Sequence, residues 1–201
     1  MKRLLLIAAI FGSMLSLRAD VETIVCVRHG EKTERELGQL SVQGLNRSLA
    51  LPRVLIGKYG RPSLILAPNP SDKKSDGTGG EFSYVRPLAT IEPTAIALGM
   101  PVDTRLGMND LDGLERKLDE PPYANAVVFI AWEHSRLEDF VRHELAHHGG
   151  DPGQAPHWHG KDFDSIYVVR ITRGPSGTSA TFTLDHEGLD HPSAQLPAPA
   201  P

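Results

Sequence analysis

The chain has only one cysteine among its 201 residues, so no disulfide within a single molecule can stabilise it. Cys26 lies inside the apolar run Thr23–Val27, which favours a buried core cysteine over a nucleophile or a lipid attachment site. Val25 also occupies the position at which a lipid-attachment box needs a small residue. The stability of the fold must therefore come from packing.

An excess of basic charge is also missing. The sequence has 21 Lys and Arg residues and 25 Asp and Glu residues, which gives a formal net charge of -4. A protein with this balance has no general attraction for nucleic acid or for an anionic membrane. We expect neither as a partner, and any anion that binds must be held by a local group of residues.

One long apolar stretch, residues 4–17, follows two basic residues at the N-terminus, which is the layout of a secretory signal peptide. We therefore expect residues 1–19 to direct export and the mature protein to be periplasmic or secreted. Leu17 and Arg18 precede Ala19, where a cleavage site prefers small residues, so an uncleaved membrane anchor is the alternative. No other contact with a membrane is expected.

The rest of the chain has the length of one domain, residues 20–190, followed by a Pro/Ala tail, residues 191–201, that we expect to be disordered. Short β-branched apolar runs predict buried strands, and segments with helical spacing lie between them. The expected strands are 23–27, 63–67, 126–131, 165–171 and 180–184, and the expected helices are 45–59, 86–98 and 135–148. This alternation predicts an α/β fold, a three-layer sandwich with a mainly parallel central sheet flanked by helices.

Two details of this fold are less regular. Pro52 and Pro93 fall inside the first two helical segments and are expected to kink or break them. Residues 69–83 are rich in Ser, Asp, Lys and Gly and are expected to be unstructured, as a solvated loop or as a lid that leads toward Arg86.

The motif Arg28-His29-Gly30-Glu31 comes directly after the first expected strand. It therefore lies at a strand's carboxyl end, where ligands collect in sheets of this kind. In this place it resembles the Arg-His-Gly signature of the histidine phosphatase superfamily. Three further landmarks follow in the family's order over roughly residues 22–170: Leu40-Ser41-Val42-Gln43-Gly44, Arg86 with Thr90, and the strand Val128–Ala131 leading through Trp132 and Glu133 to His134.

This resemblance implies a phosphatase that hydrolyses a phosphomonoester through a phosphohistidine intermediate. It implies that His29 is the nucleophile and that Arg28, Arg86 and His134 bind the phosphoryl oxygens. The substrate would be a small phosphorylated molecule or a phosphoprotein, and the oligomeric state is left open. The chain has Lys32 where the family usually has Ser or Thr, so contacts near the entrance to the site are expected to differ.

The residue types fit this chemistry on physical grounds. Phosphoryl transfer needs an in-line nucleophile and fixed positive charge around the equatorial oxygens, which two arginines and a second histidine provide without a metal or cofactor. Arginine stays protonated and presents a fork of donors that matches phosphate. His29 must attack through a neutral ring nitrogen, so its other nitrogen is expected to donate to a backbone carbonyl, with Gly30 as the candidate.

The proton donor for the leaving group is less defined. Asp110 follows the helix of the second arginine, in the region where small relatives carry their acid, and it is the favoured candidate. Glu133, Glu92 and Glu31 are the alternatives. A carboxyl group beside dense positive charge tends to stay ionised, so a working acid needs burial or the charge of the phosphate itself.

A competing motif is His143-Glu144-Leu-Ala-His147, which matches the zinc-binding helix of metallopeptidases. The position expected for a third ligand holds Gly153, and a helical projection places Glu144 on the apolar face and His143 toward solvent. We therefore interpret this segment as an ordinary amphipathic helix. A zinc metallopeptidase remains the first alternative function, and a catalytically silent phosphate-binding module of the same fold is the second.

Overall fold

The computed structural model describes residues 19–35, 37–75 and 80–197. The predicted signal peptide lies outside these residues apart from Ala19. The strands are β1 Asp20–Arg28, β2 Leu64–Leu66, β3 Lys73–Ser75, β4 Glu81–Ser83, β5 Val127–Trp132, β6 Ser165–Gly174 and β7 Gly177–His186. The helices are α1 Val42–Tyr59, α2 Arg86–Leu98, α3 Leu111–Leu118 and α4 His134–His147, with short 3₁₀ helices at Pro121–Tyr123 and Pro152–Gln154.

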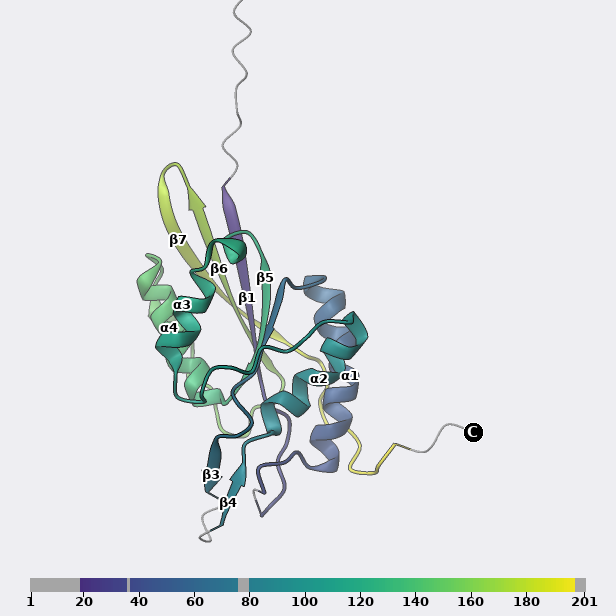
Figure 1. Ribbon diagram of the computed structural model, residues 1–201. Helices are drawn as coiled ribbons and strands as arrows, with labels where there is room; N and C mark the ends of the chain where they lie inside the picture. The colour runs from purple at the N-terminus through teal and green to yellow at the C-terminus, as the bar shows by residue number, and fades with distance from the viewer. Residues whose placement is uncertain (1–18, 36, 76–79, 198–201) are drawn as a thin grey trace, which may run out of the picture.

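A five-stranded sheet with the order β2-β5-β1-β6-β7 forms the centre of the fold, with α1 and α2 on one side and α3 and α4 on the other (Figure 1). This confirms the predicted α/β sandwich. The sheet is mixed rather than mainly parallel, because β2, β5 and β1 pair in parallel while β6 pairs antiparallel with both β1 and β7. The tight turn between β6 and β7 imposes the antiparallel pairing of these two strands, since only antiparallel neighbours can be joined by so short a connection.

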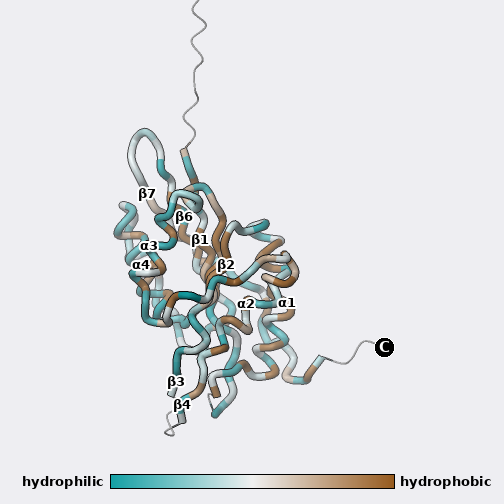
Figure 2. The backbone as a smooth tube through the Cα atoms, viewed as in Figure 1, coloured by the Kyte–Doolittle hydropathy of each residue, from teal (hydrophilic) through white to brown (hydrophobic). Residues whose placement is uncertain are grey.

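Alternate residues of the central strands supply two hydrophobic cores. In β1, Ile24 and Cys26 pack toward α3 and α4, while Val25 and Val27 pack toward α1 and α2, and none of the four is exposed. Successive side chains of a strand point to opposite faces, so a strand that is covered on both faces is apolar throughout. Figure 2 shows this as hydrophobic colour running through the central strands. The prediction that Cys26 is a core residue is confirmed.

We expected Pro52 and Pro93 to kink or break their helices; α1 and α2 continue through both prolines, so neither helix is broken. Proline removes one hydrogen bond of the helix, but most helical stability in a folded protein comes from packing of the apolar face. Leu51 and Leu55, on either side of Pro52, are fully buried against the sheet. That burial outweighs the lost hydrogen bond.

The segment 69–83 is not unstructured where it is described, because β3 and β4 pair as an antiparallel hairpin. The hairpin projects from the end of the molecule at which β1 terminates (Figure 1). In the C-terminal tail, the Asn46 side chain donates to the carbonyls of Ser193 (2.6 Å) and Gln195 (2.7 Å) on the outer surface of α1. Within the described residues, no helix combines the length and apolar character needed to cross a membrane.

Candidate active site

The pairing of β1 with β5 fixes where the signature residues meet. Arg28 lies opposite Trp132 in the parallel register, and the His29 backbone N–H extends the pairing by donating to the Trp132 carbonyl (3.0 Å). Both strands therefore end at the same edge of the sheet. Glu133 and His134 follow Trp132 directly, which brings them to the edge where His29 lies.

His29 is 2% exposed, and its Nδ1 lies 2.8 Å from the carbonyl oxygen of Gly30. A carbonyl oxygen only accepts, so Nδ1 carries the proton and Nε2 carries the free electron pair. Burial, together with the nearby charges of Arg86 and Arg28, lowers the pKa of His29 to about 3. The imidazole is therefore neutral near pH 7, and the predicted contact with Gly30 is confirmed.

The loop after β1 is held by close backbone packing. A Cβ atom at Gly30 would lie 3.0 Å from the Gly44 carbonyl, and a Cβ atom at Gly44 would overlap the backbone of Glu31. The Gly30 N–H donates to Thr90 Oγ1 (2.9 Å), which in turn donates to the Arg86 carbonyl (2.9 Å). The motif residues around Gly44 and Thr90 thus fix the loop of His29 to the first turns of α1 and α2.

Arg28 is 3% exposed, and its side chain contacts the loop of residues 160–163. Its Nη1 donates to the carbonyls of Gly160 and Asp162, both at 2.9 Å, and its guanidinium carbon lies 3.8 Å from the centre of the Phe163 ring. Burial lowers the pKa of Arg28 to about 10, which still leaves it charged near neutral pH. Its Nε is buried without a hydrogen-bond partner among the described residues.

Arg86 is the first residue of α2 and is 1% exposed. Its backbone N–H donates to the Gly38 carbonyl (3.1 Å), which sets the start of the helix. Both Nε and Nη1 of its guanidinium are buried without a partner in the described part of the chain. A buried charge with unused donors is costly unless a ligand completes it, so Arg86 is suited to an anion.

His134 begins α4, and its Nδ1 lies 2.7 Å from Glu133 Oε1. The two atoms are close enough for an ion pair, although Nδ1 does not meet hydrogen-bond geometry with that oxygen. Burial opposes ionisation of Glu133, but contacts from His134, Ser135 and Arg136 outweigh it and hold its pKa well below the usual range. A Cβ atom at Gly160 would lie 3.8 Å from His134 Nε2, so His134 faces the same loop that Arg28 contacts.

Glu31 belongs to a buried ionic group behind the site. Arg47 donates to Glu31 through Nε (3.0 Å) and Nη2 (2.8 Å), and to Glu187 through Nη1 (2.5 Å). Two carboxyl groups share this one guanidinium, and burial raises the pKa of Glu187 to about 8 despite the contact with Arg47. Glu31 is therefore engaged in anchoring the loop of His29.

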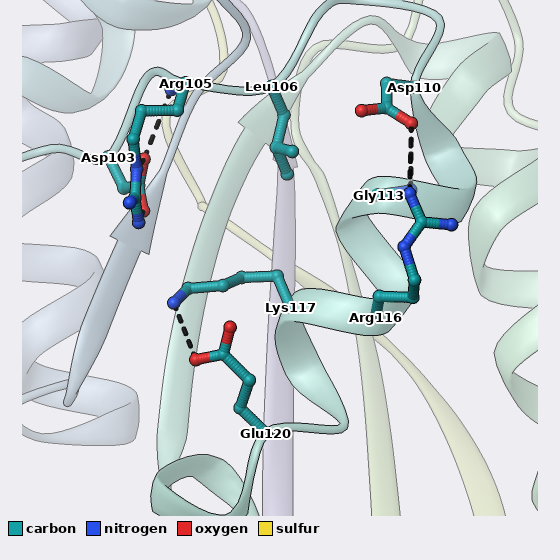
Figure 3. Close-up of a pocket in the computed structure, with 8 residues that line it drawn as sticks. All are labelled: Asp103, Arg105, Leu106, Asp110, Gly113, Arg116, Lys117 and Glu120. Carbon is teal, nitrogen blue, oxygen red and sulfur yellow. Dashed lines mark hydrogen bonds and ion pairs between the residues drawn. The ribbon is translucent and has the colours of Figure 1, made fainter.

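Asp110 caps the N-terminus of α3, where its side chain accepts from the Gly113 N–H (2.9 Å) and lies 3.9 Å from Arg116. It lines a separate pocket of about 340 Å³ beside α3 (Figure 3). Its loop is tied to the end of β5, because the Met108 carbonyl accepts from Trp132 Nε1 (2.8 Å). Glu92 is exposed on α2.

The residues of the zinc-binding motif do not converge on a cleft. His143 is largely exposed and contacts Glu115 (2.6 Å), whereas Glu144 is buried on the core side of α4, 3.4 Å from His148. A zinc peptidase needs the glutamate beside the bound water and both histidines facing it. The predicted orientation of His143 and Glu144 is confirmed, and it does not fit the peptidase alternative.

Two aromatic residues of the site were missed by the sequence reasoning. Tyr84 packs edge-on against His29, with ring centres 6.1 Å apart, and Phe163 lies 6.5 Å from the same ring. The signal for Tyr84 was an aromatic residue two positions before Arg86. Phe163 follows a loop of small and charged residues and gave no comparable signal.

Comparison with known proteins supports the fold. No protein-family model and no curated protein matches the chain. Among solved structures, a SixA protein from Nakamurella multipartitia, assigned as a phosphohistidine phosphatase, has a TM-score of 0.55 at 15% identity, covering 84% of this chain and 98% of that one. A mycobacterial glucosyl-3-phosphoglycerate phosphatase with bound inorganic phosphate has a TM-score of 0.53 at 17% identity, with 88% and 100% coverage.

A phosphoglycerate mutase from Plasmodium falciparum matches with a TM-score of 0.52 at 12% identity, covering 90% of this chain and 97% of that one. All of these structures are members of the histidine phosphatase superfamily. The fold of this chain is therefore the histidine phosphatase fold, as the four sequence landmarks predicted. At such low identity the likeness concerns the fold alone.

Proposed function

We propose that the protein is a phosphoric monoester hydrolase in which His29 forms a transient phosphohistidine. The observation that carries this proposal is the state of His29: buried, neutral, and with its proton fixed on Nδ1 by Gly30. The partnerless donors of Arg28 and Arg86 lie within electrostatic reach of the same ring. Phosphatases of the same fold, named for phosphohistidine and glucosyl-3-phosphoglycerate, add support.

In the proposed reaction, His29 Nε2 forms a bond to phosphorus as the bond from phosphorus to the leaving oxygen breaks. Arg28, Arg86 and His134 stabilise the charge on the three remaining oxygens. The leaving oxygen takes up one proton. Water then attacks phosphorus and breaks the N–P bond, and the proton that water gives up replaces the one taken up by the leaving oxygen. This step releases inorganic phosphate and restores the neutral imidazole.

Asp110 remains our proposed proton donor. Its loop is anchored to the end of β5 through Met108, and its half-exposed carboxyl group would have to leave its contact with the Gly113 N–H to reach the leaving oxygen. Glu133 is less suited to this task, because its contacts favour the ionised form. We propose instead that Glu133 orients His134 and balances the positive charge of the site.

The charge that the reaction needs is present in side chains, so we propose that hydrolysis requires no metal ion. The substrate would be a small phosphorylated molecule or a phosphoprotein. The N-terminal sequence supports action outside the cytoplasm, in the periplasm or the medium.

The test is a screen of phosphorylated compounds, including a chromogenic phosphate ester, with the wild-type protein, His29→Ala and His157→Ala. His157 is a matched control because its side chain is 67% exposed. We expect His29→Ala to abolish turnover, His157→Ala to keep it, and a phosphate adduct to appear on His29 in rapidly quenched samples. Full activity in His29→Ala would refute the covalent route, and loss of ester hydrolysis on chelation would refute the proposed independence of metal. Bound zinc without hydrolysis of any phosphate ester would favour the peptidase alternative.

A further inference from the structure

Tyr84 lies between β4 and α2 and faces the candidate active site. Its side chain is fully buried, and its backbone N–H donates to the Asp72 carbonyl (2.8 Å). Its ring stands perpendicular to the His29 imidazole at 6.1 Å, and the Arg86 guanidinium carbon lies 5.0 Å from the ring centre. The Lys74 ammonium of the hairpin lies 5.9 Å from the ring. Tyr84 is thus held in place by its ring and its backbone.

The hydroxyl group of Tyr84, in contrast, is buried without a hydrogen-bond partner in the described part of the chain. Arg86 lies near it but does not meet hydrogen-bond geometry with it. Two other tyrosines are paired: Tyr59 donates to Asp185 Oδ2 (2.6 Å) and Tyr167 donates to the Pro156 carbonyl (3.0 Å). Buried tyrosine hydroxyl groups normally find a partner, because an unpaired one costs about 1–3 kcal/mol.

Arg28 Nε and two guanidinium nitrogens of Arg86 also lack a partner among the described residues, and both arginines act electrostatically on the Tyr84 phenol. The charges that act on Tyr84 are those of the site itself, namely Arg86, Glu133 and Arg28. Burial is the largest influence and raises the pKa of the phenol above its usual range. The hydroxyl group therefore keeps its proton near neutral pH.

Building on the proposed function, we propose that the Tyr84 hydroxyl group donates a hydrogen bond to a non-bridging oxygen of the bound phosphoryl group. Tyr84 then adds a neutral donor to the charged donors of Arg28 and Arg86. A neutral donor stabilises the oxygen without raising the positive charge around His29, which must remain unprotonated to attack. The hairpin β3–β4, which leads directly into Tyr84, would position this donor.

The test compares Tyr84→Phe with Tyr59→Phe in the full chain. Both changes remove only a hydroxyl group. The Tyr59 hydroxyl group contacts Asp185 on the outer strand β7, so Tyr59→Phe is the control for loss of a hydroxyl group outside the candidate active site. Calorimetry measures the binding of orthovanadate, thermal unfolding without anions measures stability, and hydrolysis of a chromogenic phosphate ester gives kcat and KM. A hydrogen bond to a charged ligand typically contributes about 10- to 100-fold in affinity.

We expect Tyr84→Phe to weaken vanadate binding by about 10- to 100-fold and to lower kcat more than it changes KM. We expect its Tm without anions to be unchanged or higher, since an unpaired hydroxyl group is lost. Tyr59→Phe should lower Tm and leave vanadate binding unchanged. Unchanged vanadate binding in Tyr84→Phe would overturn the proposal. If its Tm were also lower while kcat stayed the same, the role of the hydroxyl group would be purely structural.

These readouts separate the proposal from the proposed function. If the wild-type protein binds vanadate but hydrolyses no ester, the phosphatase proposal fails while a binding defect in Tyr84→Phe still supports the contact. If the wild-type protein hydrolyses esters and Tyr84→Phe matches it in every measurement, only the inference about Tyr84 fails. If the wild-type protein does not bind vanadate at all, both fail.

Discussion

The contact between Gly44 and the loop of His29 allows a sharp test of how the fold positions the nucleophile. Gly44 lies in the first turn of α1, where a Cβ atom would lie 2.8 Å from the backbone nitrogen of Glu31 and closer still to its carbonyl oxygen. Real Cβ atoms do not approach backbone so closely. Gly44→Ala must therefore move the loop Gly30–Glu31 or the start of α1.

Two opposing effects set the size of the change. Alanine is favoured over glycine within a helix by about 1 kcal/mol. Forcing an extra carbon into a packed contact typically costs about 1–3 kcal/mol, and here the obstacle is backbone that cannot change rotamer. We expect a net loss of about 1–2 kcal/mol in the free energy of unfolding. Because a displacement of about 1 Å at a catalytic group can cost about 100-fold in rate, we expect kcat/KM to fall by about 10- to 100-fold.

Gly57→Ala is the matched control, because Gly57 lies in the same helix and a Cβ atom there would meet nothing within 4 Å. It should raise the free energy of unfolding by about 0.5–1 kcal/mol and leave activity unchanged. Urea denaturation and hydrolysis of a chromogenic phosphate ester provide the two measurements. If Gly44→Ala had the same effect as Gly57→Ala on both the free energy of unfolding and the activity, the close packing of Gly44 against the loop of His29 would not position the nucleophile.

Two further predictions concern the charges of the site. The pKa of His29 is about 3 when folded and about 6.5 in the unfolded chain, so the unfolded chain takes up a proton first as pH falls, and stability is lost from about pH 6.5 downward. The wild-type protein should therefore lose free energy of unfolding between pH 7 and pH 4.5, and His29→Gln should lose about 2 kcal/mol less over the same range. Urea denaturation without phosphate measures both values, and an identical pH dependence in the two proteins would contradict the prediction. Arg86→Met should raise the free energy of unfolding without phosphate by about 1–2 kcal/mol, because it removes a buried charge with unused donors, and should abolish the increase in Tm on adding phosphate. Lower stability of Arg86→Met with phosphate-dependent stabilisation intact would argue against Arg86 as an anion ligand.

The parts of the fold that were predicted from sequence are those set by local apolar pattern. The run Thr23–Val27 is apolar without interruption, as a strand covered on both faces must be, and the strand formed there. The polar residues Arg28 and His29 follow it immediately, so their position at the sheet edge required only the end of that strand. Such features depend on neighbours in the sequence and can be read from it.

The features that were missed depend on contacts between distant segments. The strands Lys73–Ser75 and Glu81–Ser83 are polar and short, so no hydrophobic alternation marks them, and their pairing arises from the chain folding back near Asp72 and Tyr84. The helix through Pro52 survives because tertiary packing compensates for the missing hydrogen bond. Neither the pairing of these two strands nor the packing around Pro52 can be predicted from a local sequence pattern.

Burial also explains why the candidate site differs from an ordinary cluster of polar residues. A surface arginine donates to water, but Arg86 is enclosed. Among the residues that the structure describes, two of its guanidinium nitrogens have no partner, and neither does the nearby Tyr84 hydroxyl group. Each such group costs free energy in the empty protein. The proposed phosphoryl group would reduce this cost, because an anion rich in acceptor oxygens can accept from guanidinium and phenol donors at the same time. The neutral His29 beside them would then meet the central atom of that anion with its free electron pair.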